Sequence, residues 1–253
     1  MKLQGSTALV TGVGADNLGQ HFARQLLSER GAAKVYATAR RPELIAVPGV
    51  EVLHLDLTDA SSIAAAADVA AQTDVLINNA ARFEAELDFL TGDVERIKEI
   101  FDTNVFGTLN VTRAFAPVLA RNGGGAILNV LSAMAWSTFA GINVYGASKA
   151  AAWSLTNAVR GELAGQGTQV TSLVFGMAGT APMRAYADAV AAPGALDAMI
   201  TAPEDIVRKA LDGLEAGDLE VLGDQLAVDA KAALSGEPQS VYATLVDGSR
   251  TEE

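Results

Sequence analysis

The sequence contains no cysteine and no long apolar run. The missing cysteine excludes disulfide bonds, thiolate catalysis and cysteine-ligated metals. No apolar segment approaches the roughly 20 residues that a membrane-spanning helix needs. Residues 1–10 carry one lysine before a strand-like run and have no small-residue cleavage site, so they do not resemble a secretory signal peptide. We therefore expect a cytoplasmic protein.

Basic clusters and histidines are also scarce. Eighteen Lys and Arg against 30 Asp and Glu give a net charge of −12. No basic run is present that would bind nucleic acid or an anionic membrane. His21 and His54 are isolated, whereas a metal site needs three or four converging ligands. We expect no nucleic-acid partner, no membrane partner and no metal.

Short apolar runs alternate with helical patterns along the whole chain. The runs lie at 7–12, 34–39, 50–57, 74–80, 125–132, 169–176 and 219–223, and the helix-length segments at 18–30, 59–72, 91–121, 145–164 and 203–216. Most runs are almost continuously hydrophobic, as strands of a sheet covered on both faces must be. The pattern predicts one α/β domain over residues 1–253: a doubly wound parallel sheet (Rossmann fold) of about seven strands with helices on both faces.

Residues 177–202 lack a clear period and contain Pro182, Pro193 and Gly194. A long irregular segment inside a compact domain is usually functional or mobile. This one follows the sixth predicted strand at the carboxyl edge of the sheet, where such folds bind ligands. We expect it to be a substrate lid that is mobile in the free enzyme.

The stretch 10–20, VTGVGADNLGQ, ends a strand at Gly12 and precedes a helix that starts near Leu18. Its glycines fit G-x-G-x-x-G with Asn17 in the last place, or T-G-x-x-x-G-x-G with one inserted residue and Gly19 as the closing glycine. A helix N-terminus attracts a pyrophosphate, although an ordinary strand–helix turn would use similar glycines. We expect a cofactor loop of Gly12, Gly14, Asn17, Leu18 and Gly19, with Asn17 in a glycine-like conformation and a bulge at 14–16.

The second predicted strand ends in Arg40 and Arg41 and carries no carboxylate. NAD-binding folds usually hold the ribose 2′-hydroxyl with a carboxylate at this position, whereas guanidinium groups suit a 2′-phosphate. The pair favours NADP(H) over NAD(H). Two solvated surface arginines are the alternative.

Ser132, Tyr145 and Lys149 form the strongest chemical pattern. The tyrosine and lysine are four apart and share one helix face. Ser132 closes the fifth strand, so all three can meet at the carboxyl edge of the sheet. A phenol titrates near pH 10, and a neighbouring ammonium with a cationic nicotinamide ring would favour the phenolate.

In their order along the chain, these motifs resemble the short-chain dehydrogenase/reductase family. The matching segments are the loop at 11–19, Asp56-Leu57, residues 78–81 (NNAA), Asn104, Ser132, Tyr145, Lys149 and residues 175–180 (FGMAGT). The resemblance implies that Tyr145 is the general acid/base and that Ser132 bonds the substrate oxygen. It implies that Lys149 holds the nicotinamide ribose and perturbs Tyr145, while Asn104 supports a water path.

The resemblance also assigns the remaining cofactor contacts. Asp56 and Leu57 would border the adenine, Asn79 and Ala80 would line the cofactor, and Ala178 and Thr180 would lie at the nicotinamide. The chain departs from the family in the loop insertion, where Asp16 stands at a position that is often basic in NADP-preferring members. It also has NNAA for NNAG and Phe175-Gly176 for Pro-Gly.

The implied function is an NADP(H)-dependent carbonyl reductase or alcohol dehydrogenase. The expected pocket wall is almost wholly apolar, although Trp136 and Phe139 suit core packing equally well; it comprises Phe83, Ala133, Met134, Trp136, Phe139, Phe175, Met177, Met183 and Tyr186. This composition favours an apolar ketone or aldehyde as substrate.

Several alternatives share the scaffold. An NAD(H)-preferring alcohol dehydrogenase is one. A halohydrin dehalogenase would have Arg in place of Lys149, and a nucleotide-sensing or scaffold protein would usually lose the tyrosine or lysine. An extended epimerase would need a larger C-terminal domain.

The resemblance also bears on assembly. In this family the helices predicted at 91–121 and 145–164 pair across a two-fold axis, which implies a homodimer or homotetramer. The C-terminal stretch, read as a helix over Gln225–Leu234 and a polar tail, slightly favours the dimer.

Overall fold

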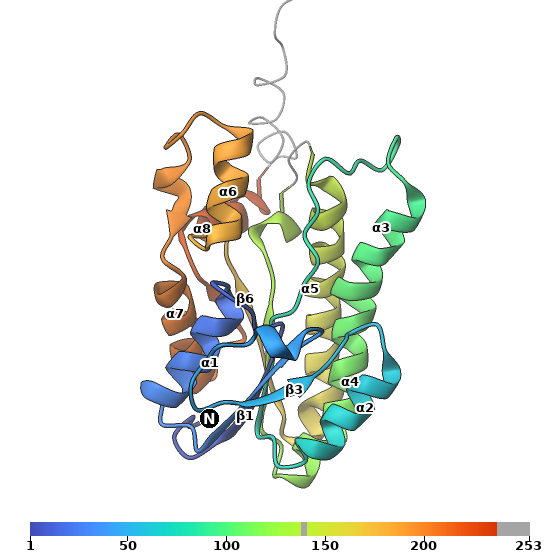
Figure 1. The fold of residues 1–253 in the computed structure, drawn as a ribbon, viewed down its shortest axis with the longest axis vertical. Coiled ribbons are helices and arrows are strands. Elements are labelled where there is room, and N and C mark those ends of the chain that lie inside the picture. The colour runs from blue at the N-terminus through green and yellow to red at the C-terminus, as the bar shows by residue number, and fades with distance from the viewer. Residues whose placement is uncertain (138–140, 237–253) are drawn as a thin grey trace, which may run out of the picture.

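A computed structural model describes residues 1–137 and 141–236 of the chain (Figure 1). Its described residues contain a parallel sheet of seven strands in the order β3-β2-β1-β4-β5-β6-β9. The strands are β1 Thr7–Thr11, β2 Lys34–Ala39, β3 Glu51–His54, β4 Val75–Asn78, β5 Ala126–Val130, β6 Gln169–Val174 and β9 Glu220–Leu222. The predicted doubly wound parallel sheet is confirmed.

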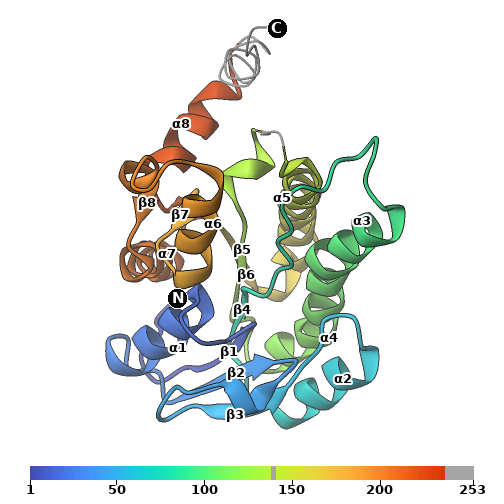
Figure 2. The same ribbon diagram turned by 45° about the horizontal axis from the view of Figure 1, so that its top comes forward.

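Helices cover both faces of the sheet (Figures 1 and 2). One face carries α1 (Leu18–Ser28) and α7 (Pro203–Ala216), and the other carries α2 (Ala60–Val69), α4 (Thr108–Arg121) and α5 (Asn143–Leu163). Val10 packs with Phe22 on the face covered by α1 and α7. Its neighbour Leu9 packs with Phe115 on the opposite face. Because successive strand residues face opposite layers, both must be apolar.

The strand order reverses beside β1. The chain runs outward from β1 through β2 to β3 and then returns to β4 on the other side of β1. In open parallel sheets this reversal leaves a crevice at the carboxyl ends of the strands. The loops after β1, β4 and β5, which carry most of the predicted site residues, all leave the sheet at this edge.

The helix predicted over 91–121 is present from Val94 to Arg121, but its middle is not α-helical. It consists of α3 (Val94–Phe101), a π-helical segment (Asp102–Gly107) and α4. A Cβ on Gly107 would lie 2.7 Å from the Cβ of Leu57, so only glycine permits this close approach. Such π-helical turns are frequent at functional sites, and this one carries Asn104.

The absence of regular structure predicted for 177–202 is wrong. The segment contains β7 (Met177–Ala178), α6 (Ala181–Val190) and β8 (Ile200–Thr201), and β7 pairs with β8. Pro182 lies in the first turn of α6, where proline is tolerated, and therefore does not mark a loop. Only Ala187 of this helix is buried, which explains the weak apolar period.

The predicted C-terminal helix is present as α8 (Gln225–Ala233). Asp224 caps it by accepting from the amide of Ala227 at 2.9 Å, and its other oxygen accepts from the amide of Gly176 at 2.7 Å. One buried carboxylate thus joins α8 to the turn after β6. In the part of the chain that the structure describes, no helix is long and apolar enough to span a membrane.

Candidate active site

Ser132, Tyr145 and Lys149 lie together beyond the end of β5. Ser132 is 4% exposed, and its hydroxyl accepts from the amide of Met134 at 3.2 Å. Tyr145 lies in the first turn of α5, and the Ser132 side chain is close enough to its hydroxyl to lower its pKa. Lys149 follows one turn later, with Nζ 5.7 Å from the centre of the Tyr145 ring. The structure brings these three side chains to one place.

Burial dominates the electrostatics of this group. It raises the pKa of Tyr145 to about 12, a shift that the hydrogen bond with Ser132 only partly offsets. It also lowers the pKa of Lys149 to about 8, while the ammonium donates to the carbonyl of Val130 at 3.0 Å. Tyr145 is therefore protonated at neutral pH. The cost of desolvating its phenolate outweighs the attraction of that phenolate to the Lys149 ammonium.

Asn104 is fixed by contacts on both sides of its amide. Its Oδ1 accepts from the amide of Arg82 at 2.7 Å, and its Nδ2 donates to the carbonyl of Arg82 at 3.0 Å. Nδ2 also donates to Ser148 Oγ at 2.9 Å, and Ser148 in turn donates to the carbonyl of Tyr145 at 2.7 Å. Asn104 and Ser148 thus tie the loop after β4 to the first turn of α5.

The glycine-like conformation predicted for Asn17 is wrong. Asn17 is extended (φ −128°) and is the N-cap of α1, accepting from the amides of Gln20 at 3.0 Å and Gly14 at 3.1 Å. Its Nδ2 donates to the carbonyl of Gly12 at 2.9 Å. The left-handed residue is Asp16, with φ 46°. The side-chain amide of Asn17 therefore closes the loop, and the left-handed backbone that the turn requires lies at Asp16.

Gly12 and Gly19 allow the loop to pack against β4. A Cβ on Gly12 would lie 2.6 Å from Cα of Ala80, and one on Gly19 would lie 2.7 Å from Nδ2 of Asn79. Asn79 holds this contact by donating to the carbonyl of Thr11 at 2.9 Å. The result is a close-packed loop, followed directly by Leu18 and the N-terminus of α1, at the strand-order reversal. This geometry fits a dinucleotide.

The other predicted end of the cofactor site lies at β2 and β3. Arg40 and Arg41 are both exposed at the end of β2. Partial burial raises the pKa of Asp56, but hydrogen bonds from Thr58 and the charge of Arg40 hold it below the usual range overall. Leu57 is buried beneath the π-helical segment. Arg40 is therefore close enough to Asp56 to lower the pKa of its carboxyl group.

An aromatic row connects Tyr145 to α6. The ring of Phe83 lies 5.1 Å from that of Tyr145 and 5.2 Å from that of Tyr186, edge-on in both cases. Phe83 follows β4, and Tyr186 lies on α6 together with half-buried Met183. Three of the expected aromatic groups are therefore neighbours.

The other predicted pocket residues divide between several places. Trp136 packs edge-on against Trp153 at 5.9 Å, and Nζ of Lys231, on α8, lies 4.8 Å from the Trp136 ring. Phe175 packs against the core cluster of the α1 and α7 face. The rest of the predicted pocket is Ala133 and Met134 in the turn after β5 and Met177 in β7. Two predicted cofactor contacts lie nearby, Ala178 in β7 and Thr180 before α6. Phe139 lies outside the described residues.

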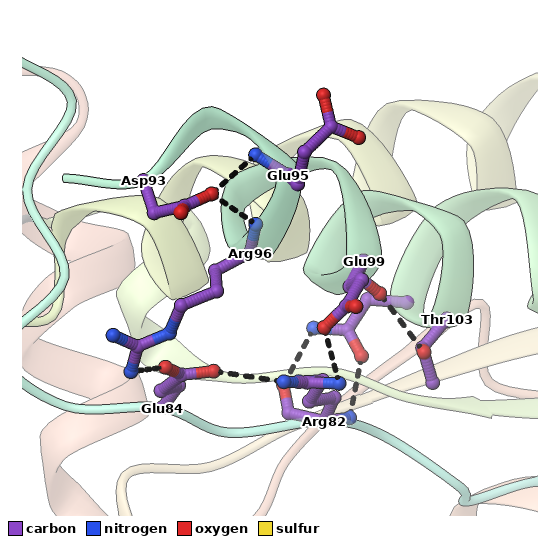
Figure 3. A network of polar contacts seen from close by, with 8 residues as sticks. Arg82, Glu84, Asp93, Glu95, Arg96, Glu99 and Thr103 are labelled. Atoms are coloured by element: carbon purple, nitrogen blue, oxygen red, sulfur yellow. Dashed lines mark hydrogen bonds and ion pairs between the residues drawn. The ribbon is translucent and has the colours of Figure 1, made fainter.

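An ion-pair network that corresponds to no sequence motif holds the segment after β4 (Figure 3). Arg82 pairs with Glu84 at 3.2 Å and with Glu99 of α3 at 2.8 Å, and Arg96 also pairs with Glu84. The backbone of Arg82 is the part that bonds Asn104. In the sequence, only the position of Arg82, directly after residues 78–81, indicated that it lies near the predicted site.

The family model for short chain dehydrogenase matches residues 6–191. The chain belongs to the short-chain dehydrogenase family. Among its relatives, a short-chain dehydrogenase of Talaromyces islandicus is 28% identical over 67% of this chain and 62% of its own length. An oxidoreductase of Staphylococcus aureus strain N315 is 30% identical over 71% of this chain and 80% of its own.

Solved structures of short-chain dehydrogenases superimpose closely on this chain. A Burkholderia cenocepacia short-chain dehydrogenase in complex with NADP has a TM-score of 0.85 and 36% identity, covering 97% of this chain and 99% of its own. A 3-ketoacyl-(acyl-carrier-protein) reductase of Brucella melitensis complexed with NADH has a TM-score of 0.75 and 25% identity, covering 89% and 100%. The protein is thus an oxidoreductase of this family.

Proposed function

We propose that this short-chain dehydrogenase interconverts an apolar ketone or aldehyde and its alcohol with NADP(H) as cofactor. The observation that carries the proposal is the half-buried Tyr145, with Ser132 beside its hydroxyl and Lys149 Nζ 5.7 Å from its ring centre. The three groups lie at the same edge of the sheet as the close-packed loop that fits a dinucleotide. A hydroxyl pair beside an ammonium can hold a carbonyl oxygen and supply it with a proton.

Ser132 and Tyr145 would both donate hydrogen bonds to the carbonyl oxygen. A bound nicotinamide would supply the hydride for the carbonyl carbon. Tyr145 would then transfer its hydroxyl proton to the alkoxide oxygen, and its raised pKa means that it holds this proton at neutral pH. In the alcohol-oxidising direction the phenolate must form, and the charge on Lys149 is the nearby group that favours it.

The cofactor preference rests on Arg40 and Arg41. Both are exposed, and β2 is followed by them rather than by a carboxylate that would hold a ribose 2′-hydroxyl. A guanidinium there can make charge-assisted contacts with a 2′-phosphate. The NADP complex of the similar Burkholderia protein supports this choice, and the NADH complex of the Brucella reductase makes NAD(H) the alternative.

The substrate class rests on the surroundings of Tyr145. Phe83 and Tyr186 present ring surfaces there, and Met183 lies on the same helix as Tyr186. Aromatic and thioether groups bind apolar surface and offer few hydrogen bonds to a polyol or a carboxylate. An aryl or alicyclic carbonyl compound suits this environment best.

A substrate panel with both cofactors tests the proposal. We would follow nicotinamide absorbance with acetophenone, cyclohexanone and decanal, and with pyruvate and glucose as polar controls. Faster turnover of the apolar carbonyls with NADPH is expected. If neither NADPH nor NADH binds in a titration of nicotinamide fluorescence, the reductase proposal fails and a non-catalytic role takes its place.

Replacing Arg40 by alanine tests the cofactor preference. Losing a charge-assisted contact with the 2′-phosphate should raise the Kd for NADPH about 10–100-fold and the Kd for NADH less than about threefold. Fluorescence titration measures both constants. Arg24→Ala, which removes an exposed arginine from α1, is the matched control. Equal weakening of both cofactors by the Arg40 substitution would show that this arginine does not meet the 2′-phosphate.

A further inference from the structure

Asp16 has an unusual backbone conformation for its residue type. Its φ of 46° places it in the left-handed region, and Glu86 is the only other non-glycine residue with positive φ in the described ranges 1–137 and 141–236. Asp16 is also the part of the loop that the family spacing does not predict. Strained residues persist where the surrounding structure holds them and are concentrated at functional sites.

The Asp16 side chain crosses from the cofactor loop to α6. Its Oδ2 accepts from the amide of Ala181 at 2.8 Å, across 165 positions of the sequence. Ala181 is the first residue of α6, and Thr180, in the N-cap position, makes no side-chain capping bond. A carboxylate at a helix N-terminus meets both a free donor and the positive end of the helix dipole. Asp16 therefore supplies the cap that α6 lacks locally.

A second contact holds α6 near the catalytic tyrosine. Tyr186 packs on Phe83, and Phe83 packs on Tyr145. Apart from these two contacts α6 is weakly held, since Ala187 is its only buried residue. A helix with so little buried apolar surface depends strongly on individual polar bonds. Its position beside Phe83 thus depends on the cap that Asp16 provides.

We propose that Asp16 is a positioning residue that couples the cofactor loop to α6, so that a dinucleotide on the loop stabilises the helix carrying Tyr186 against Phe83 and Tyr145. This inference rests on the proposed function for its effect on turnover. The link itself, from Asp16 to Ala181, is a property of the protein without any ligand. By reciprocity, a helix held in place also favours the loop conformation that binds the dinucleotide.

Three substitutions of Asp16 separate the carboxylate from the backbone strain. Asp16→Gly suits the left-handed backbone and removes the cap, whereas Asp16→Ala removes the cap and keeps the strain. Asp16→Asn keeps an acceptor oxygen and tolerates the conformation, so it should rescue the effect. Asp188→Ala, which removes an exposed carboxylate from α6 itself, is the matched control.

Amide hydrogen exchange of the full chain, with and without NADPH, is the decisive measurement. In Asp16→Gly the amides of the first two turns of α6 should exchange about fivefold faster, as expected for the loss of one helix cap. NADPH should slow exchange in α6 of the wild type and of Asp16→Asn, but not of Asp16→Gly. Unchanged α6 exchange in Asp16→Gly, or equally faster exchange in α7, would overturn the proposal.

Kinetics provides the second readout. With acetophenone, Asp16→Gly should raise KM at least about threefold, and because the coupling is reciprocal the Kd for NADPH should rise with it, by about two- to fivefold. A loss of NADPH affinity with unchanged KM and unchanged exchange in α6 would indicate a role in the loop alone and would contradict the coupling. If the wild type binds no NADPH, the proposed function fails, whereas exchange in the ligand-free variants still decides whether Asp16 holds α6.

Discussion

Replacing Tyr145 by phenylalanine is expected to lower kcat by about 10²–10⁴-fold, because in the proposed reaction it removes the hydroxyl that would transfer a proton to the substrate oxygen. The phenylalanine ring keeps the edge-on contact with Phe83 at 5.1 Å. The fold and the Kd for NADPH should therefore change little. Steady-state kinetics and fluorescence titration of the same preparation separate the two effects.

Tyr186→Phe is the matched control for this substitution. It removes the other phenol of the same aromatic row, 5.2 Å from Phe83, and leaves the ring in place. Because Tyr186 lies on α6 and has no contact with Ser132 among the described residues, most of the turnover should survive. Turnover above a tenth of the wild-type rate in Tyr145→Phe would show that another group transfers the proton.

Replacing Lys149 by methionine is expected to abolish a pH dependence of stability as well as to lower kcat about 10²–10³-fold. Burial lowers the pKa of Lys149 to about 8 in the folded protein, from 10.5. Between these two values the unfolded chain binds more protons than the folded one, so the free energy of unfolding rises with pH. The gain between pH 7 and 10 should be about 2–3 kcal/mol in the wild type relative to the variant.

Urea unfolding at a series of pH values measures this difference. The series stops at pH 10 so that the titration of Tyr145 does not enter the measured difference. Burial raises the pKa of Tyr145 from 10.0 to about 12, so the stability that Tyr145 contributes is lost as pH rises from 10 to 12. Lys209→Met is the control, since Lys209 also donates to a backbone carbonyl, that of Gly223 at 3.0 Å, but is exposed. Parallel wild-type and Lys149→Met curves would mean that this lysine is not desolvated.

The sheet and its two helical layers could be predicted because their causes are local. A parallel strand that packs on both faces must be apolar at almost every position, and Leu9 and Val10 show this directly. Tyr145 and Lys149 could be placed together because helix geometry brings residues four apart onto one face. These inferences needed no knowledge of distant contacts.

The remaining features depend on partners far away in the sequence. Asp16 could not be identified as the left-handed residue, because its conformation is held by a bond to Ala181. Helix α6 was missed since its apolar period is weak and its cap comes from another loop. The raised pKa of Tyr145 follows from burial, which spacing along the chain does not reveal.

The packing of Trp136 against Trp153 has a practical consequence for optical work on this protein. They are the only two tryptophans in the chain, and both lie near Lys231, which is 4.8 Å and 5.7 Å from their ring centres. Both indoles therefore emit from the same local environment, which α8 completes. Intrinsic fluorescence will therefore report on the docking of α8 at this one place.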